Sequence, residues 1–216
     1  MLRESEVATD VKATETARRR YDRIAPVYDL MESAMEGFGY GKWRKLVWSR
    51  VEGADILEVG VGTGKNFPYY PATAEITAID FSERMLQRAK DKAAAQQVRV
   101  DLKQMDVQNL EYADNMFDTV VASFVFCSVP DPVRGLKEIE RVCKPAGKVV
   151  LLEHVLSANR ILGWLMNLVN PLVVRMMGAN INRRTVDNVA KSGLIVEQVT
   201  DLGAGIFKLI EARKRP

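Results

Sequence analysis

Short apolar runs alternate with helix-forming segments through the middle of this chain, and this order leaves few folds open. The run FDTVVASFVF lacks polar alternation, as is typical of strands buried on both faces of a sheet. One predicted helix begins after Ser82, and a second, over 131–147, is closed by Pro145 and Gly147. Strands that alternate with helices form right-handed βαβ units and a parallel sheet. The five predicted strands lie at residues 54–60, 75–80, 98–106, 117–126 and 148–155.

The end of the chain follows a different pattern. Two further strands, at 193–200 and 205–214, have no room for a helix between them, so they are expected to pair antiparallel. The 216 residues are expected to form one α/β domain with a mainly parallel, seven-stranded sheet and a C-terminal antiparallel hairpin. Its expected parts are a helical cap (1–50), a cofactor-binding core (51–153), an apolar insertion (154–183), and a helix with the hairpin (184–216).

A glycine-rich loop, LEVGVGTGKN, joins the first predicted strand to the next segment. Residues without side chains at Gly60, Gly62 and Gly64 allow a sharp turn and a close approach to a ligand. Two common cofactor loops fit poorly. A phosphate-binding P-loop requires Ser or Thr where Asn66 stands, and a dinucleotide loop requires its third glycine where Lys65 stands.

S-adenosylmethionine is the third possible ligand, and the acidic residues favour it. Glu58 lies two residues before the loop, and Asp80 and Asp106 follow the second and third predicted strands. The cofactor carries a sulfonium and an ammonium group, so carboxylates near it are favourable. Asp80 is predicted to hold the ribose hydroxyls and Asp106 to meet the adenine amino group. Further residues predicted to line the cofactor site are Phe81, Met85, Val107 and Ser123.

Charge is distributed unevenly. Residues 51–153 carry 12 Lys/Arg and 16 Asp/Glu, whereas residues 154–216 carry 9 and 4. An acidic middle suits a cationic cofactor, and basic flanks suit an anionic partner, although random surface variation gives the same pattern.

The motifs EVGVGTG, ID, MDVQNL and SFVFCSV, in this order, resemble those of class I S-adenosylmethionine-dependent methyltransferases. The resemblance implies a Rossmann-like three-layer sandwich and this cofactor. RRRYDRIAPVYDLMES resembles the start of quinone C-methyltransferases and of bacterial phospholipid N-methyltransferases, which implies that Tyr21 and Tyr28 lie near cofactor and substrate. SFVFCSVPDP, EHV and NINRRT are more similar to the phospholipid group and to lipid-droplet thiol methyltransferases.

The insertion contains 14 uncharged residues between Arg160 and Arg175, too few to span a bilayer. Pro171 is expected to break it into two short helices. Trp164 and its apolar neighbours could contact an acyl chain or a membrane, with Arg175, Arg183 and Arg184 at an anionic head group. A buried helix that caps the sheet is the alternative.

The acceptor follows from this layer of resemblance. The predicted reaction is N-methylation of phosphatidylethanolamine by a cytoplasmic, peripherally membrane-associated enzyme. An ammonium group has a pKa near 10 and must lose a proton before attack. Tyr21, Tyr28, Asp131 and His154 are possible acceptors of that proton. The open alternatives are a quinone C-methyltransferase, a small-thiol S-methyltransferase, and a cofactor- or lipid-binding module without activity.

Several classes of partner are not expected. The two cysteines, Cys127 and Cys143, have no CxxC spacing, which argues against a metal site or a disulfide framework and for a reducing compartment. The first residues show no apolar signal segment. No basic patch interleaved with aromatic residues points to nucleic acid.

Overall fold

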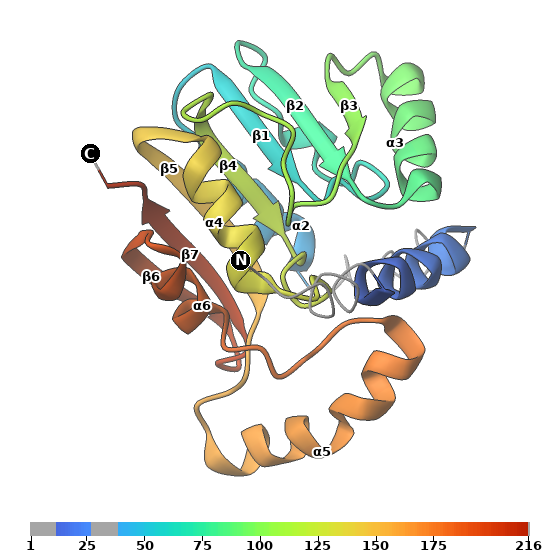
Figure 1. The fold of residues 1–216 in the computed structure, drawn as a ribbon, viewed down its shortest axis with the longest axis vertical. Helices are drawn as coiled ribbons and strands as arrows, with labels where there is room; N and C mark the ends of the chain where they lie inside the picture. Colours follow the sequence, from blue (N-terminus) through green and yellow to red (C-terminus); the bar gives the residue numbers. More distant parts are fainter. Residues whose placement is uncertain (1–11, 27–38, 216) are drawn as a thin grey trace.

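A computed structural model of the chain describes residues 12–26 and 39–215. Its centre is one seven-stranded sheet of order β3-β2-β1-β4-β5-β7-β6 (Figure 1). The first five strands pair in parallel, and β7 pairs antiparallel with both β5 and β6. The predicted sheet and its antiparallel hairpin are therefore confirmed. The strands are β1 (Asp55–Val59), β2 (Glu75–Asp80), β3 (Asp101–Gln104), β4 (Phe117–Ser123), β5 (Cys143–His154), β6 (Ile195–Gly203) and β7 (Phe207–Arg213).

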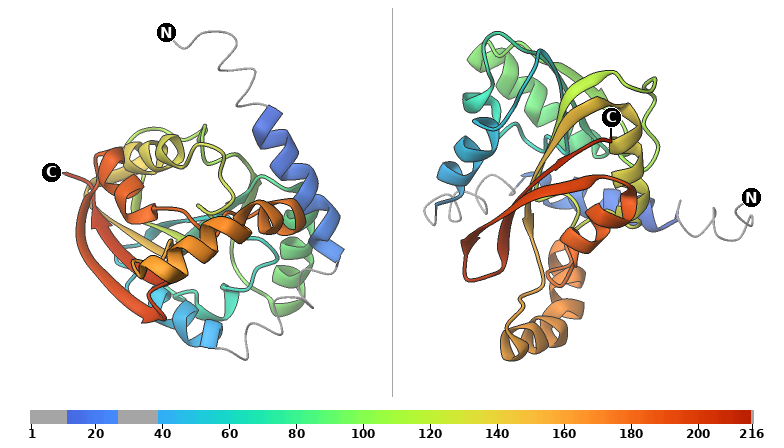
Figure 2. Two further views of the ribbon diagram at one scale, coloured as in Figure 1. Left: turned by 90° about the horizontal axis from the view of Figure 1, so that it is seen from below. Right: turned by 90° about the vertical axis from the view of Figure 1, so that its left-hand side faces the viewer.

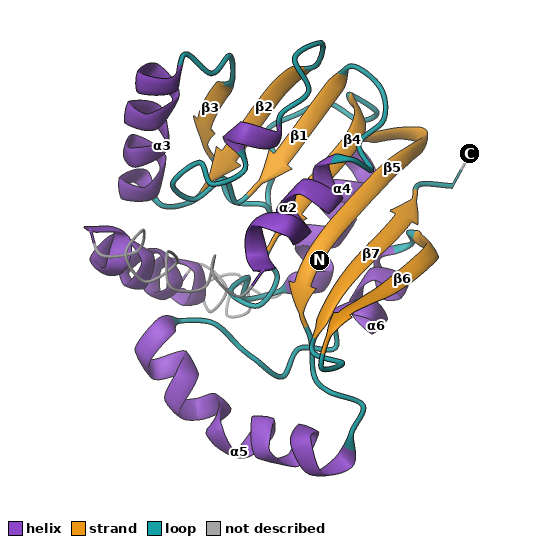
Figure 3. Ribbon diagram, turned by 180° about the vertical axis from the view of Figure 1, so that it is seen from behind, coloured by secondary structure: helices purple, strands orange, loops and turns teal. Residues whose placement is uncertain are grey.

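Helices cover both faces of the sheet (Figures 1 and 3). Apolar residues of α4 and α6 pack with one face in a single buried cluster, while α2 and α3 supply apolar residues to the other face. This is a three-layer sandwich, as expected. The helices are an N-terminal helix (residues 12–26), α2 (Gly41–Trp48), the 3₁₀ turn η2 (Phe67–Tyr69), α3 (Glu83–Gln96), α4 (Pro132–Val142), α5 (Arg160–Met177) and α6 (Thr185–Ser192).

The predicted helix starts are correct. Ser82 caps α3 by accepting a hydrogen bond from the Met85 backbone N–H at 3.2 Å. Asp131 caps α4 in the same way, through the Arg134 N–H at 3.0 Å, with Pro132 in its first turn.

Two predicted boundaries around β4 and β5 are wrong. The second predicted helix does not extend to Gly147, because α4 ends at Val142 and Cys143 begins β5 by pairing with Phe117. Pro145 cannot continue a helix, so the chain leaves α4 before it, and Cys143 enters the strand buried in the core. The fourth run stops being a strand after Ser123, where Phe124 takes a φ of +60° and the chain turns. The apolar run continues past the strand because Phe126, in that turn, is fully buried in the core.

The expectation that Pro171 divides the insertion into two helices is also wrong. One helix, α5, runs from Arg160 to Met177 with Pro171 inside it, and its ribbon bends (Figure 3). Side chains of α5 hold the returning chain: Asn170 Oδ1 accepts from the Ile181 N–H at 2.9 Å, and Asn182 Nδ2 donates to Asn167 Oδ1 at 2.9 Å. These bonds, made by the turn of α5 just before Pro171, tie the bent helix to the chain that returns after it.

Both α5 and the N-terminal helix lie beyond the carboxyl ends of the parallel strands (Figure 2). They approach each other at Gly178, where an added Cβ would lie 3.4 Å from Arg20 and 3.7 Å from Tyr21. Among the described residues, no helix combines the length and the apolar character that crossing a membrane requires.

Candidate active site

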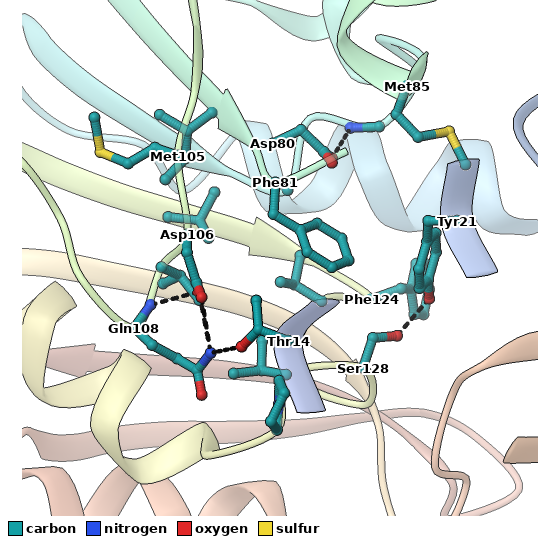
Figure 4. Close-up of a pocket in the computed structure, with 18 of the residues that line it drawn as sticks. Thr14, Tyr21, Asp80, Phe81, Met85, Met105, Asp106, Gln108, Phe124 and Ser128 are labelled. Atoms are coloured by element: carbon teal, nitrogen blue, oxygen red, sulfur yellow. Dashed lines mark hydrogen bonds between the residues drawn. The ribbon is translucent and has the colours of Figure 1, made fainter. Parts of the chain in front are cut away.

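A pocket opens at the carboxyl ends of β1, β2 and β4, with an empty volume of about 680 Å³ that includes space open to solvent. In this sheet β1 lies between β2 and β4, so the chain order reverses at this point, which is where open α/β sheets bind ligands. Figure 4 shows the wall, which draws on strand ends, loops and the N-terminal helix.

The glycine loop forms the floor of the pocket. Gly60 has a φ of +71°, and its backbone passes so close to Val125 that an added Cβ would lie 2.4 Å from Val125 Cγ2. Gly62 has a φ of +56° and no other residue within 4 Å of an added Cβ. The loop therefore requires glycine at residue 60 for packing as well as for conformation, and at residue 62 for conformation and open space toward the pocket.

Asp80 is the best-placed acid in the wall. Its Oδ2 accepts from the Gly62 N–H at 2.9 Å and its Oδ1 from the Ser82 N–H at 2.9 Å, so it links the glycine loop to the start of α3. Each oxygen keeps further lone pairs for a ligand hydroxyl. Burial raises the pKa of Asp80 to about 6, although these backbone donors oppose the shift.

We expect the affinity for S-adenosylmethionine to fall as pH drops below about 6. An ionised Asp80 accepts hydrogen bonds and attracts a cation, whereas a protonated Asp80 accepts more weakly and carries no charge. If only the ionised form binds the cofactor, the affinity falls about tenfold for each pH unit below the pKa of Asp80. Calorimetric titrations between pH 5 and 8 would measure it. An affinity that is constant over this range would contradict the assignment, and the Asp80→Asn variant should show little such dependence.

The opposite wall connects to the N-terminal helix. Asp106 Oδ1 accepts from the Gln108 N–H at 2.9 Å, and Gln108 Nε2 also reaches Asp106 Oδ2 at 3.0 Å and Thr14 Oγ1 at 2.9 Å. Tyr21 forms a short hydrogen bond with Ser128, and its ring meets Phe81 edge to face at 5.6 Å (Figure 4). The N-terminal helix thus closes one side of the pocket through Thr14 and Tyr21.

Most of the residues predicted for the cofactor do meet in this pocket. The wall includes Gly60, Gly62, Asp80, Phe81, Met85, Asp106, Val107, Ser123 and Tyr21. Sequence reasoning missed Thr14, Met105, Gln108, Phe124, Val125 and Ser128. Gln108 and Ser128 stand inside the motifs MDVQNL and SFVFCSV and could have been found there, whereas Thr14 carries no signal. Tyr28 lies outside the described residues.

Glu58 and Gly64 do not line the pocket. Glu58 is fully buried and accepts hydrogen bonds from Asn66 Nδ2 at 2.5 Å and from the Tyr70 hydroxyl. Its side chain points to the face of the sheet covered by α2, because strand residues alternate between faces. Burial raises the pKa of Glu58, while the bonds to Tyr70 and Asn66 oppose the shift. Glu58 therefore ties β1 to the segment that follows the glycine loop, and its predicted contact with the cofactor stays a prediction.

The residues predicted for the substrate are scattered. His154 lies at the end of β5, outside the pocket wall, with its ring edge to face with Phe207 at 5.1 Å. Arg183 Nη2 donates to the Val129 backbone carbonyl at 2.9 Å, so this side chain points into the protein rather than to a surface. Trp164, Arg175 and Arg184 are exposed. Asp131 is engaged as the cap of α4.

Known proteins resemble this arrangement. A family described as "Methyltransferase domain" matches residues 57–151. A phosphatidylethanolamine N-methyltransferase of Cereibacter sphaeroides is 38% identical over 148 residues, which cover 65% of this chain and 68% of that protein. A ubiquinone/menaquinone biosynthesis C-methyltransferase of Geotalea daltonii is 34% identical over 149 residues, covering 64% and 63%.

The chain belongs to the S-adenosylmethionine-dependent methyltransferases. The fold agrees: a solved methyltransferase of Thermotoga maritima, described as a possible histamine N-methyltransferase, superposes with a TM-score of 0.71 at 22% identity, covering 92% of this chain and all of that one. Within residues 12–26 and 39–215, no three His, Cys, Asp or Glu side chains gather in a group that could hold a metal ion.

The residues of this methyltransferase fit its cofactor. Asp80 offers a buried carboxylate beside a loop whose Gly62 leaves open space, and Phe81, Met105 and Val107 give the neighbouring wall an apolar surface. These groups would hold a ribose diol and an adenine ring, with Asp106 near the ring. S-adenosylmethionine supplies an activated methyl group, so the chain's own task is to bind, align and exclude water.

Proposed function

We propose that this methyltransferase N-methylates phosphatidylethanolamine at a membrane surface. The observation that carries the proposal is an exposed apolar stripe along α5, at the end of the molecule where the pocket opens. Ile161, Trp164 and Leu168 have exposed fractions of 74%, 62% and 62%. The stripe consists of Ile161, Trp164, Leu165, Leu168, Val169 and Leu172, whose three- and four-residue spacing places them on one side of a helix.

The stripe is distinct from the face of α5 that packs on the protein. Met166 is 6% exposed, and Asn170 bonds the returning chain. Large apolar side chains gathered on a surface indicate a partner.

Charge around α5 favours an anionic bilayer as that partner. Residues 155–186 contain four arginines and no Asp or Glu. A helix with an apolar face and basic flanking residues binds at the interface of anionic membranes. A lipid head group could then reach the pocket while its acyl chains remain in the membrane. The similarity to the phosphatidylethanolamine enzyme supports the same acceptor.

Among the possible proton acceptors, His154 has the most suitable state. Burial lowers its pKa, so the imidazole is neutral at pH 7, and its buried Nδ1 has no hydrogen-bond partner among the described residues. Burial raises the pKa of Tyr21 far above 10, so this hydroxyl stays protonated and acts by hydrogen bonding. We propose that Tyr21, in the pocket wall, orients the acceptor and that the ammonium proton passes to His154, which lies outside this wall, through intervening groups.

A second candidate acceptor is a quinone precursor. An aromatic cluster of Tyr40, Trp43, Phe124 and Phe207 lies beside the pocket, with ring centroids 4.9 to 5.7 Å apart for four of its pairs. Phe124 belongs to the pocket wall as well. Flat rings favour such surfaces, and the quinone enzyme of Geotalea daltonii is a relative.

The acceptor is tested with radiolabelled S-adenosylmethionine and liposomes that contain phosphatidylethanolamine and an anionic lipid. We expect label in the amine lipid. Parallel reactions offer a demethylated quinone and a small thiol. Label in the quinone or in the thiol, with none in the amine lipid, would refute the phospholipid acceptor. Cofactor binding without transfer to any acceptor would indicate a binding module.

Replacing Trp164 and Leu168 by glutamate is expected to reduce binding to anionic vesicles at least tenfold. Each side chain loses about 1.5–3 kcal/mol of apolar burial, and the new charges repel the surface. Cosedimentation measures vesicle binding, and calorimetry should show unchanged affinity for S-adenosylmethionine. The matched control replaces Ile195 and Val199 on β6 by glutamate. These side chains are 45% and 40% exposed but lie outside α5. Equal binding by both variants would contradict the role of the stripe.

A further inference from the structure

Glu153 is a buried acid that methyl transfer, as described above, does not use. It is the next-to-last residue of β5 and is fully buried. Its Oε1 accepts from the backbone N–H groups of Val125 at 3.0 Å and Phe126 at 3.1 Å. Its Oε2 is buried without a hydrogen-bond partner among the described residues. One side-chain oxygen therefore satisfies two consecutive N–H groups of the turn that follows β4.

This turn, residues 124–129, starts from a strained backbone. Phe124 has a φ of +60°, a conformation that is unfavourable for a residue with a bulky side chain. Strained backbone persists only where the surroundings fix it. The Phe124 N–H donates to the Leu152 carbonyl at 2.7 Å, and Glu153 holds the next two residues, so the end of β5 fixes the first half of the turn.

Three parts of the active site meet on the turn. Val125 packs against Gly60 in the cofactor loop. Ser128 bonds Tyr21 of the N-terminal helix. The carbonyl of Cys127 accepts from the Asn180 N–H at 2.8 Å, which ties the turn to the segment that follows α5.

We infer that Glu153 is a positioning residue of this methyltransferase: through its hydrogen bonds to the turn at 124–129 it sets the distance between the glycine loop, Tyr21 and the segment after α5. It touches neither cofactor nor substrate. The inference goes beyond the proposed acceptor, because it concerns how the cofactor pocket is held together, whatever molecule is methylated.

The surroundings of Glu153 make it an uncharged acid at neutral pH. Burial raises its pKa to about 8, against the opposing effect of the backbone N–H groups of the turn. The groups near it are Tyr21 from the N-terminal helix and Cys127 from the turn, both protonated, since burial raises the pKa of each. Lys208, the residue of β7 that lies opposite Glu153 in the sheet, forms an ion pair with Asp201 at 2.9 Å. With Oε1 engaged by N–H groups, the proton belongs on Oε2, so glutamine is a close mimic of the neutral acid.

The test compares Glu153→Gln with Glu153→Ala, using S-adenosylmethionine affinity by calorimetry well below the melting temperature of each variant. We expect alanine to weaken binding about tenfold or more, because two buried N–H groups lose their acceptor and the turn relaxes away from Gly60. Glutamine, which keeps an acceptor at Oε1, should bind within about threefold of the parent. If alanine does not fold, Glu153→Asp, one methylene shorter, takes its place, with the same expected weakening.

The matched control is Glu211→Gln. Glu211 is another buried acid, 6% exposed, in β7 and ion-paired with Lys148 at 3.1 Å rather than bound to the turn. It should change stability and leave cofactor affinity unchanged. Parental affinity in the folded alanine or aspartate variant would overturn the inference, and so would equal weakening by glutamine and alanine.

A second readout is stability against pH. A pKa of about 8 in the folded chain, against an ordinary value of 4.5, means that the parent loses stability relative to Glu153→Gln as pH rises from 4.5 to 8, after which the difference is constant. A difference that is independent of pH would contradict the neutral state of Glu153. Because neither readout involves a methyl acceptor, failure of the phospholipid assay leaves them unaffected.

Discussion

Replacing Asp80 by alanine is expected to weaken S-adenosylmethionine binding by about 10² to 10⁴-fold. A hydrogen bond to a charged group contributes about 1.5–3 kcal/mol, and the proposed ribose contact involves two hydroxyl groups. Alanine also leaves the N–H groups of Gly62 and Ser82 without their acceptor, so the glycine loop loses its tie to α3. Calorimetry measures the affinity, and methyl transfer at saturating acceptor should fall with it.

Asp80→Asn separates the charge from the hydrogen bonds. Asparagine keeps one acceptor oxygen and should bind better than alanine but more weakly than the parent. Because the pKa of Asp80 is raised from 3.8 to about 6, the parent loses stability as pH rises between these values, and the asparagine variant does not. Relative to the parent, Asp80→Asn should therefore gain stability as pH rises from 3.8 to about 6, although its amide leaves one of the two backbone N–H groups of Gly62 and Ser82 without an acceptor. Parental cofactor affinity in both variants would refute the assignment of this pocket to S-adenosylmethionine.

Gly60→Ala is expected to lower the free energy of unfolding by about 2–5 kcal/mol and to reduce cofactor binding severely. A φ of +71° costs a residue with a Cβ about 1–2 kcal/mol, and overpacking against Val125 adds about 1–3 kcal/mol. The loop must shift, and its backbone is the pocket floor. Chemical denaturation and calorimetry measure the two effects.

Gly62→Ala is the matched control for backbone strain. Its φ of +56° is similar, but no other residue lies within 4 Å of the added Cβ, so the stability loss should be only about 1–2 kcal/mol. Adding Val125→Ala to Gly60→Ala removes the two methyl groups nearest to the new Cβ and should recover stability, with a coupling of about 1–3 kcal/mol. Equal losses of stability in Gly60→Ala and Gly62→Ala would contradict the packing explanation. So would the absence of coupling between Gly60→Ala and Val125→Ala.

The order of elements was predictable because it depends on local patterns. Apolar runs marked the buried strands, Ser82 marked the start of α3, and the short gap before β7 required an antiparallel pair. The cofactor acids followed from topology alone. The carboxyl ends of neighbouring parallel strands meet at one edge of the sheet. Asp80, the last residue of β2, and Asp106, two residues after β3, therefore come together there.

The failures occurred where side-chain direction or packing decides. The side chain of Glu58 bonds Asn66 and Tyr70 on the α2 face of β1 and does not line the pocket, so its contact with the cofactor stays a prediction. Pro171 indicates a helix break, yet hydrogen bonds from Asn167 and Asn170 keep α5 continuous.

The sequence by itself determined the βαβ order, the glycine loop and the acids at the strand ends, because spacing and turn chemistry are properties of neighbouring residues. Tertiary structure alone decided which side chains face the pocket, that the stripe on α5 is exposed, and that Glu153 is buried against the turn after β4. These outcomes depend on contacts between segments far apart in the chain, and a linear pattern does not encode which of two faces a segment buries.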